Sequence, residues 1–326
     1  MKNILLIGGM GYIGSIITNY FLNKKYKVYV LDNVIYKQNY VLNSFINRKN
    51  FFFYRLDLSK VDKIKNLIID NEIKNIVLLA GLVGDPITKK YKKLSIENNE
   101  KKILHFITKL NQYYSERFIF ISTCSNYGLS KKNIVLDENS LLKPLSLYAK
   151  SKVKIEKYLI KNNFSFDFCI LRFATAFGAS YRMRYDLTVN EFTKELYTNN
   201  IVDIYDYDTW RPYCHVYDFA SIIFKILNIE KKKFNKQIYN CGSDKNNISK
   251  KKLGEMISKK IKGSKINLLD FSKDRRNYIV NFNKIKKAIG NHRFKSIDYG
   301  ISEIIKLLDS NIDDSLFMNG NYELFK

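Results

Sequence analysis

The first fourteen residues constrain the fold more than any other part of this chain. A short apolar run, NILLI (3–7), precedes Gly8, Gly9, Gly11 and Gly14, and apolar residues at helical spacing follow. A strand, a glycine-rich turn and a helix in this order are typical of a dinucleotide site, where N–H groups at the helix N-terminus face phosphates. We interpret Gly8 as the tight turn, Gly11 as the approach to a pyrophosphate and Gly14 as the contact between helix and sheet.

The next apolar runs extend this pattern into a parallel sheet. Runs at 26–31, 51–54 and 76–81 alternate with helical patterns, and Asp32 follows the first of them, 18 residues after Gly14. A carboxylate at this place accepts the ribose hydroxyls of NAD and repels the extra phosphate of NADP. The position of Asp32 therefore favours NAD as the cofactor.

Residues at the ends of the third and fourth runs are further candidates for the cofactor site. Asp57 and Leu58 follow the third run, and Asp57 either contacts an adenine or caps the helix that comes next. Leu79, Ala80 and Gly81 end the fourth run, where small residues allow a cofactor to approach the backbone closely.

The composition indicates a folded chain without a membrane segment. Apolar residues make up 46% of 326 residues, and no apolar run reaches the roughly 18 residues that span a bilayer. The N-terminal apolar run stops at glycines, so we interpret it as a strand and not as a signal peptide. Four scattered cysteines without a CxxC pair favour a cytoplasmic protein without disulfides. No cluster of histidine, cysteine and carboxylate has ligand spacing, so we expect no metal.

The formal net charge of +25 has two interpretations. It either attracts an anionic partner, or it reflects a composition in which Lys, Asn, Ile and Tyr are all abundant. No basic tail, zinc finger or aromatic RNA-binding motif accompanies it, so we expect no nucleic-acid partner.

Tyr148 and Lys152 stand four residues apart and therefore project from one face of a helix. A free tyrosine has a pKa of about 10, and lowering it to about 7 takes about 4 kcal/mol of differential stabilisation. A nearby ammonium group and the positive nicotinamide ring supply charge of the required sign. The phenolate then takes a proton from a hydroxyl. Alternatively, the two residues are a solvent-facing pair in a chain rich in both.

The spacing GxxGxxG, Asp32, the segment STCSNYG (122–128) and the pair in LYAKSK (147–152) together resemble the extended short-chain dehydrogenase/reductase superfamily, especially its nucleotide-sugar epimerases and dehydratases. The resemblance implies a Rossmann-type doubly wound α/β sheet with a smaller, discontinuous substrate domain. It implies Thr123, Tyr148 and Lys152 as the catalytic residues. The residues expected to bind NAD are Gly8, Gly11, Tyr12, Ile13, Gly14, Asp32, Asn33, Asp57, Leu58, Leu79, Ala80, Gly81, Asn98, Tyr148 and Lys152.

The sequence departs from the dehydratases of this superfamily directly after Thr123. Those enzymes carry an acidic pair or a glutamate there, and so do the related decarboxylases as a rule, whereas this chain has Cys124 and Ser125. Elimination of water then has no obvious acid catalyst. The resemblance leaves oxidation at one sugar carbon, and Ser125 is expected to touch the sugar.

The second half of the chain resembles the substrate-binding half of these enzymes. Residues 174–193 are expected to cross over a nucleotide-sugar diphosphate, with Arg182, Arg184 and Asn190 holding it. Arg211 in the RPxxHVxD-like segment 210–218 is a further expected diphosphate contact, and Arg276 in the segment 274–280 is a further phosphate or ribose contact, although one or two of the arginines are alternatively surface charge.

Two further assignments remain open in the sequence. For His215 and Asp218 we favour a structural role, because this motif usually anchors a helix onto the sheet. Asn98 or Asn99 matches an asparagine on the nicotinamide side, and we prefer Asn98.

The expected domains are an NAD-binding domain at 1–173, to which 200–230 returns with the strand IVDIYDY and the helix that begins at HVYD, and a substrate domain formed by 174–199 and 231–326. The segment at 178–192 and LVGDP (82–86) resemble a narrower subgroup that includes GDP-heptose 4-dehydrogenases and 4-epimerases of surface polysaccharides. In this superfamily the helices after Asn98 and around Tyr148 pair with a second subunit, so the resemblance implies a homodimer.

Three functions remain. The first is an NAD-dependent nucleotide-sugar 4-epimerase that acts by hydride transfer at C4 through a 4-keto sugar. The second is a 4-dehydrogenase or 4-ketoreductase, which needs the same residues but changes the amount of NADH. The third is a non-catalytic RNA-binding protein of the same fold, which the charge alone supports.

Overall fold

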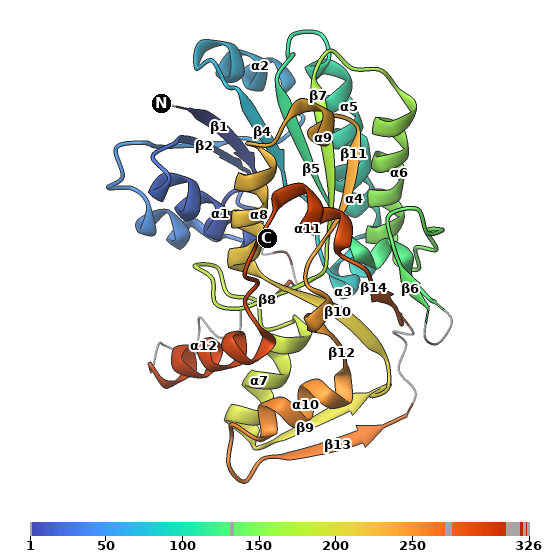
Figure 1. Cartoon of the computed structure of the whole chain (residues 1–326). Helices are drawn as coiled ribbons and strands as arrows, with labels where there is room; N and C mark the ends of the chain where they lie inside the picture. Colours follow the sequence, from blue (N-terminus) through green and yellow to red (C-terminus); the bar gives the residue numbers. More distant parts are fainter. Residues whose placement is uncertain (1, 131–133, 271–275, 311–319, 322–323, 325–326) are drawn as a thin grey trace.

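A seven-stranded parallel sheet forms the frame of the molecule (Figure 1). The computed structural model describes residues 2–130, 134–270, 276–310, 320–321 and 324. The strand order is β11-β7-β5-β4-β1-β2-β3, and every neighbouring pair is parallel. The strands are β1 (Asn3–Ile7), β2 (Lys27–Asp32), β3 (Phe51–Arg55), β4 (Asn75–Leu78), β5 (Arg117–Thr123), β7 (Asp167–Phe173) and β11 (Gln237–Cys241). This order confirms the predicted Rossmann-type α/β fold.

The register brings the carboxyl ends of the strands to one edge of the sheet. Ile7 pairs with Leu31 on one side and with Leu78 on the other, and Thr123 pairs with Phe173. In open parallel sheets, ligands bind outside this edge. The residues that directly follow the strands are therefore placed where a cofactor site can form.

Helices cover both faces of the sheet, and alternate residues of each strand point to opposite faces. Ile4 and Leu6 of β1 pack with one set of helices, whereas Leu5 and Ile7 pack with the other. The first set is α1 (Tyr12–Asn23), α8 (Val216–Ile226) and α11 (Asn283–Ile289). The second set is α2 (Val61–Asp70), α5 (Lys102–Leu110) and α6 (Leu147–Lys161). Strands buried on both faces explain the nearly continuous apolar runs in the sequence.

Short helices occupy the loops at the edges of the sheet. They are η1 (Asn39–Ser44), α3 (Asp85–Lys90), α4 (Lys92–Ile96), η3 (Cys124–Tyr127), α9 (Lys231–Phe234) and η4 (Asp244–Asn246). Between α4 and α5 the chain forms one π-helical segment, η2 (Glu97–Lys101), without interrupting the helical path. Such segments are rare and are frequent near functional sites.

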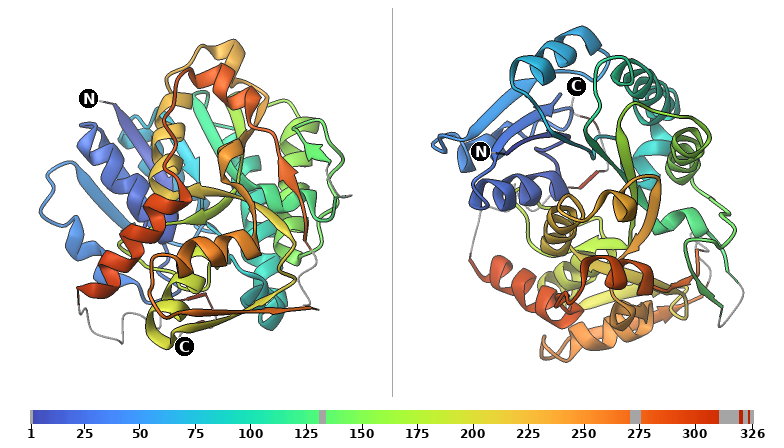
Figure 2. Two further views of the ribbon diagram at one scale, coloured as in Figure 1. Left: turned by 60° about the horizontal axis from the view of Figure 1, so that its bottom comes forward. Right: turned by 45° about the horizontal axis from the view of Figure 1, so that its top comes forward.

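A smaller part of the structure lies beyond the carboxyl edge of the large sheet (Figures 1 and 2). Its helices are α7 (Thr188–Asn199), α10 (Lys250–Ser258) and α12 (Ile297–Asp309). Its strands are β8 (Thr175–Phe177), β10 (Trp210–His215) and β12 (Asn247–Ser249) in one sheet, β9 (Ile201–Tyr205) with β13 (Lys265–Leu269), and β6 (Val135–Leu136) with β14 (Ile279–Val280). A separate apolar core joins its helices to β9 and β10.

The structure corrects the expected return of the chain to the large sheet. The predicted strand at 201–207 is β9, which pairs with β13 and lies outside the large sheet. The helix expected in the same segment is α8, which does pack on the large sheet, and the chain later rejoins the sheet itself through β11, at its edge beside β7. An apolar pattern predicts a strand but not the strand with which it pairs. For this reason the prediction that residues 201–207 join the large sheet was wrong. The expected domain limits at residues 1 and 326 lie outside the described residues.

The cysteines and the helices bear on two further expectations. Cys124, Cys169, Cys214 and Cys241 are all free and buried. Among the described helices, none has both the length and the apolar character needed to cross a bilayer.

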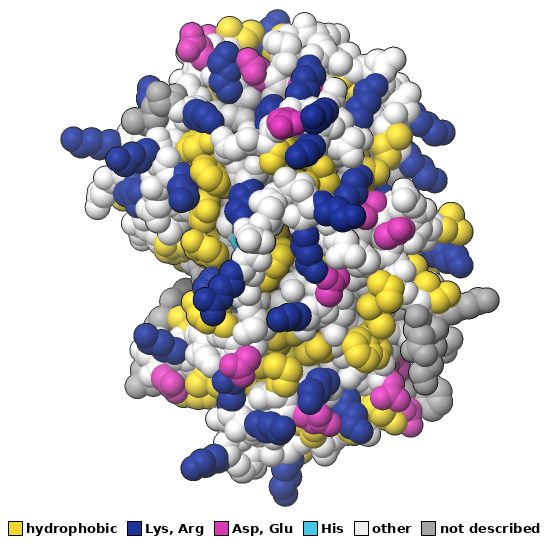
Figure 3. Space-filling view, in the orientation of Figure 1, with side chains coloured by type: hydrophobic (Ala, Val, Ile, Leu, Met, Phe, Trp, Pro, Cys, Tyr) yellow, Lys and Arg dark blue, Asp and Glu magenta, His cyan; other side chains and the backbone are white. Residues whose placement is uncertain are grey.

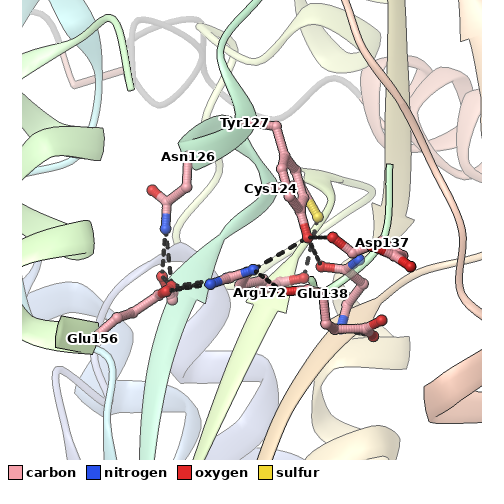
Figure 4. Close-up of polar contacts among 9 residues, drawn as sticks. Cys124, Asn126, Tyr127, Asp137, Glu138, Glu156 and Arg172 are labelled. Carbon is pink, nitrogen blue, oxygen red and sulfur yellow. Dashed lines mark hydrogen bonds and ion pairs between the residues drawn. The ribbon is translucent and has the colours of Figure 1, made fainter. Parts of the chain in front are cut away.

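A buried polar network ties α6 to the end of β5 (Figure 4). The Glu156 carboxylate accepts hydrogen bonds from Ser122 Oγ and Asn126 Nδ2, and it pairs with Arg172 of β7 at 2.7 Å. The side chains of Arg172 and Glu156 are 4% and 1% exposed. Arg172 Nη1 also donates to Tyr127 Oη at 3.2 Å. Two strands, one helix and the turn after β5 therefore meet at a single carboxylate.

We predict that Glu156→Gln destabilises the protein by about 3–5 kcal/mol, because removing one partner of a buried pair leaves the other charge uncompensated. Denaturant unfolding measures this difference. The matched control is Glu116→Gln, which breaks an exposed pair with Lys74 and should cost at most about 1 kcal/mol. Equal effects of the two substitutions would show that the buried network does not fix α6.

Candidate cofactor and active site

A cavity opens at the carboxyl edge of the large sheet and encloses about 1120 Å³, including solvent space at its mouth. Every residue that the sequence assigns to the cofactor is part of its wall. The lining residues are Ile7, Gly8, Gly11, Tyr12, Ile13, Gly14, Leu31, Asp32, Asn33, Ile35, Tyr36, Gln38, Leu56, Asp57, Leu58, Leu79, Ala80, Gly81, Leu82, Val83, Asn98, Lys102, Ile121, Tyr148, Lys152, Arg182, Arg184 and Asn321.

The glycine turn forms the floor of the cavity. Gly8 has a φ of +92°, which side chains rarely adopt, and so it permits the tight turn. A Cβ on Gly14 would lie 2.1 Å from the Gly8 carbonyl oxygen, so Gly14 packs against the turn itself. The contact with the sheet that we expected at Gly14 is made at Gly9, where a Cβ would lie 2.7 Å from Val30 Cγ1. A Cβ on Gly11 would meet only one atom, at 3.5 Å.

Asp32 lies buried at the end of β2. Its carboxylate accepts hydrogen bonds from Met10 N at 3.0 Å, Val34 N at 2.8 Å and Gln38 Nε2 at 3.3 Å. Burial raises the pKa of Asp32, while the two backbone N–H groups and the charge of Arg182 act in the opposite direction. A carboxylate has about four acceptor positions. Three are in use, which leaves room for a ribose hydroxyl.

Asp57 takes part in a chain of polar contacts along the cavity wall. Lys102 Nζ lies 2.9 Å from its carboxylate, and Asn33 Nδ2 donates to it at 3.2 Å. Burial alone would raise the pKa of Asp57, but the bonds from Lys102, Ser59 and Asn33 lower it to about 2. Helix α2 begins at Val61 without a side-chain cap. The alternative in which Asp57 caps this helix is therefore wrong, and the side chain faces the cavity instead.

Tyr148 and Lys152 both lie on the cavity side of α6, whose N-terminus is capped by Ser146 Oγ. Lys152 Nζ donates to the Ile121 carbonyl at 2.8 Å and lies 5.7 Å from the centre of the Tyr148 ring. Burial lowers the pKa of Lys152 to about 7, and the Glu156 carboxylate acts in the opposite direction. The pair is part of the cavity wall, so the alternative of a solvent-facing pair does not hold.

The two candidate asparagines have different surroundings. Asn98 lines the cavity, and its Oδ1 accepts a hydrogen bond from Lys102 Nζ at 3.0 Å. Asn99 is buried and exchanges hydrogen bonds of 2.7 and 2.8 Å with the backbone N–H and carbonyl of Leu82. Asn99 thus holds the loop after β4 against η2. In the sequence, only the adjacent pair Asn98–Asn99 pointed to this contact.

Thr123 and Ser125 are not among the residues that line the cavity, but Ile121, which shares the strand face of Thr123, is one of them. Thr123 Oγ1 accepts the Ser125 N–H at 3.1 Å and caps η3. Ser125 Oγ lies 3.4 Å from the hydroxyl of Tyr278, which is buried. Tyr278 was not among the predicted site residues, because no local pattern in the sequence indicates its contact with Ser125.

Arg211 and Arg276 gather around the same tyrosine. Arg211 Cζ lies 5.3 Å from the centre of the Tyr278 ring. Burial raises the pKa of Tyr278, and the charges of Arg211 and Arg276 oppose this change. Three residues predicted to contact the substrate, Ser125, Arg211 and Arg276, therefore form one cluster around Tyr278.

Arg182, Arg184 and Asn190 lie elsewhere. Arg182 and Arg184 line the cofactor cavity, and Arg184 pairs with Asp186 through its Nε at 2.9 Å. Asn190 is buried, accepts the Gly178 N–H at 3.1 Å and donates to the Arg184 carbonyl at 2.9 Å. All polar atoms of the Asn190 amide are thus engaged within the protein, which indicates a structural role.

His215 and Asp218 make structural contacts at the start of helix α8. His215 Nδ1 accepts the Tyr217 N–H, and its Nε2 lies 2.9 Å from Glu303. Asp218 accepts the Lys295 N–H at 2.9 Å. These contacts attach the start of α8 to segments near the C-terminus.

The cavity fits a dinucleotide by its own features. Helix α1 has twelve residues, its N-cap Gly11 makes no side-chain cap bond, and its first turn holds no acidic residue. Its N–H groups and positive dipole end are therefore available to phosphates. The open space at Gly11 admits such a group, and Asp32 lies within the same cavity for a ribose. When bound, NAD supplies a two-electron acceptor at this place.

Known proteins agree with this fold and cofactor. The UDP-glucuronate 4-epimerase of Thermodesulfobacterium geofontis is 23% identical over 96% of this chain and 98% of its own length. An uncharacterized protein of Methanocaldococcus jannaschii is 28% identical over 75% of this chain and 76% of its own. The crystal structure of UDP-glucuronic acid 4-epimerase from Bacillus cereus, with UDP-glucuronic acid and NAD, superposes with a TM-score of 0.83 at 22% identity, over 95% of this chain and all of that one.

The model of the NAD dependent epimerase/dehydratase family matches residues 4–242, which is more than half of the chain. The family depends on NAD, and the related structures hold it. NAD is therefore the cofactor, and this chain belongs to the NAD-dependent epimerase/dehydratase family of the extended short-chain dehydrogenase/reductases.

Proposed function

We propose that this protein is a nucleotide-sugar 4-epimerase that works at C4 through a 4-keto sugar, in the synthesis of surface polysaccharides. The observation that carries the proposal is the placement of Tyr148 and Lys152 in the wall of the cofactor cavity, on the helix that the Glu156 carboxylate ties to Ser122 at the end of β5 and to Asn126 in the turn after it. The names of the relatives, which include 4-epimerases of UDP-sugars, support it.

In this proposal each catalytic residue handles a proton or a charge. Tyr148 takes the proton of the sugar hydroxyl and returns it after the keto sugar has rotated in the site. The Lys152 ammonium favours the phenolate form of Tyr148. Thr123 orients the sugar hydroxyl. Because burial lowers the pKa of Lys152 to about 7, the Glu156 carboxylate helps to keep the charge that this role requires.

The surroundings of Thr123 argue against a dehydratase. Cys124 directly follows it, and its thiol donates to the Arg172 carbonyl at 3.2 Å. Burial raises the pKa of Cys124, so the thiol does not supply a proton or accept one near neutral pH. Ser125 next in the chain carries no acid either. A 4-keto sugar formed in this site therefore does not lose water, and it can take the hydride back.

We assign the substrate diphosphate to the cluster around Tyr278. Arg211 and Arg276 provide two cations there, and a guanidinium suits a phosphate because of its planar, bidentate geometry. Ser125 in the same cluster touches the sugar. Arg182, Arg184 and Asn190, which the sequence assigned to the diphosphate, are not part of this cluster.

We further propose a cytoplasmic homodimer. Helices α5 and α6 cover the same face of the large sheet, and the resemblance to the superfamily implies that they pair with a second subunit. Free, buried cysteines suit a reducing compartment.

The charge on the face that Figure 3 shows does not favour an RNA-binding function. In Figure 3, Lys and Arg side chains are scattered over the whole face among Asp and Glu side chains and do not form one stripe. A nucleic-acid site normally gathers its cations on one face.

The reaction is tested by proton NMR of the purified protein with UDP-, GDP-, CDP- and dTDP-sugars and no added cofactor. We expect one sugar to give its C4 epimer in many turnovers, because the hydride returns to the same sugar. A keto sugar in an amount limited by the enzyme would instead identify a dehydrogenase, and a product that has lost water would identify a dehydratase.

We predict that Tyr148→Phe lowers kcat by about 10²- to 10⁴-fold, the usual contribution of a general acid or base. NAD binding should stay within a few-fold of the wild type, because the ring is retained. The control is Tyr205→Phe, which changes an exposed tyrosine of β9 and should leave kcat unchanged. Full activity of Tyr148→Phe would refute the assigned base.

A second prediction concerns the charge of Lys152 in cofactor-free protein. Its folded pKa of about 7 lies below the unfolded value of about 10.4, so the unfolded chain binds more protons between these values. The unfolding free energy of the wild type relative to Lys152→Met should therefore rise with pH, by at most about 1.4 kcal/mol per pH unit between pH 7 and 10. Urea titrations at several pH values measure it.

The matched control for this series is Lys150→Met, which changes an exposed lysine on the same helix. Its unfolding free energy should follow the wild type at every pH. A flat difference between the wild type and Lys152→Met would mean that Lys152 titrates near its ordinary pKa.

A further inference from the structure

The guanidinium of Arg182 is a buried charge without a carboxylate partner among the described residues. Arg182 is 5% exposed and lines the cofactor cavity. Within the part of the chain that the structure describes, its one hydrogen bond goes from Nη2 to Asn321 Oδ1 at 2.9 Å, and its Cζ lies 4.3 Å from the centre of the Tyr36 ring. The nearby Arg184 differs, because Asp186 neutralises it.

Such a charge is costly unless an anion completes its surroundings. A guanidinium carries five N–H donors, and buried charges in proteins are normally paired. Burial and the charge of Arg184 lower the pKa of Arg182, while the charge of Asp186, which pairs with Arg184, acts in the opposite direction. The missing partner therefore comes from a ligand of the cavity that Arg182 lines.

The contents of the cavity identify the chemistry of this ligand. Its wall includes the glycine turn at the N-terminus of α1 and the carboxylate of Asp32. The turn suits the pyrophosphate of a dinucleotide, and Asp32 repels a phosphate on the ribose 2′-oxygen. A pyrophosphate carries two negative charges and is the anion that fits this place.

We propose that Arg182 pairs with the pyrophosphate of bound NAD and that Asn321 holds Arg182 in this position, so that the cofactor stays bound through turnover. Arg182 is thus a cofactor-retaining residue, whereas the sequence assigned it to the substrate diphosphate.

Asn321 connects the two sides of the cavity. It is 3% exposed; its Oδ1 accepts the bond from Arg182, and its Nδ2 donates to the Val83 carbonyl at 2.7 Å. Val83 belongs to the loop after β4, and Arg182 to the segment between β8 and α7. One amide near the C-terminus therefore bridges segments that lie far apart in the sequence, and all three residues line the cavity.

This inference rests on the proposed function in one respect. A 4-epimerase must keep its reduced cofactor until the hydride returns, whereas a dehydrogenase exchanges it in each cycle. A pyrophosphate clamp closed by Asn321 favours retention. The binding of NAD can, however, be measured without any sugar, so the two proposals can fail separately.

The test is isothermal titration calorimetry of cofactor-free Arg182→Gln with NAD, ADP and adenosine. We expect the Kd for NAD and for ADP to rise about 10- to 100-fold, as for loss of a charge-assisted hydrogen bond. The Kd for adenosine, which has no phosphate, should not change. Asn321→Ala should speed NAD dissociation about 3- to 10-fold. Arg293→Gln, an exposed arginine, is the matched control and should bind NAD like the wild type.

Four outcomes would overturn the proposal. Equal weakening of adenosine and ADP would show that Arg182 only supports the adenosine pocket. A larger loss for NADP than for NAD would place Arg182 on a 2′-phosphate. A higher KM for the nucleotide sugar with an unchanged Kd for NAD would restore the substrate assignment. If Arg182→Gln does not fold, Arg182→Lys is measured in its place. The pairing would also be rejected if Arg182→Lys binds NAD as tightly as the wild type and the Kd of the wild type does not depend on salt.

Discussion

The ion pair between Glu156 and Arg172 fixes the helix that carries Tyr148 and Lys152. Glu156 lies on the same face of α6, one turn after Lys152, and the same carboxylate accepts hydrogen bonds from Ser122 and Asn126 at the end of β5. Tyr148, Lys152 and the loop after Thr123 are therefore positioned by one buried anion. A buried pair is weak evidence for stability as such. Its value here lies in geometry, because a shift of about 1 Å in a catalytic group can cost about 100-fold in rate.

The cations of the candidate site fall into two groups with different partners. Arg211 and Arg276 lie around Tyr278 and Ser125, while Arg182 and Arg184 lie in the wall of the cofactor cavity. Both groups suit phosphates, and the sequence analysis assigned all four arginines to the substrate. Under the two proposed assignments, the dinucleotide and the nucleotide sugar each have their own cations, so that release of the sugar would not require release of the cofactor.

Most of the correct predictions rest on short patterns within the sequence. The apolar runs, the glycine turn, Asp32 and the spacing of Tyr148 and Lys152 are short-range signals, and the structure brings these residues to one cavity. The errors concern long-range partners. The alternating strand β9 pairs with β13 outside the large sheet, and β11 takes the edge position beside β7. A strand pattern shows which face is buried but not which strand it joins.

The residues that the sequence analysis missed share this cause. Tyr278 meets Ser125 across 153 positions, and Asn321 meets Val83 across 238. Neither residue has a neighbour in the sequence that marks it, because each acts through a contact that only the fold creates. Arg182 was found as a phosphate-binding candidate, but its charge alone does not tell which phosphate it meets.

The groups around the keto sugar separate the reactions that this scaffold supports. The family is one of epimerases and dehydratases, and in the proposed reaction hydride leaves C4 of the sugar. The fate of the keto sugar then depends on the acids near it and on how firmly the cofactor is held. Here the turn after β5 presents a buried thiol and a hydroxyl in place of a carboxylate, and a buried arginine faces the cofactor cavity without a carboxylate of its own among the described residues. If Arg182 retains NAD as proposed, a site with no carboxylate for elimination in this turn is suited to giving the hydride back.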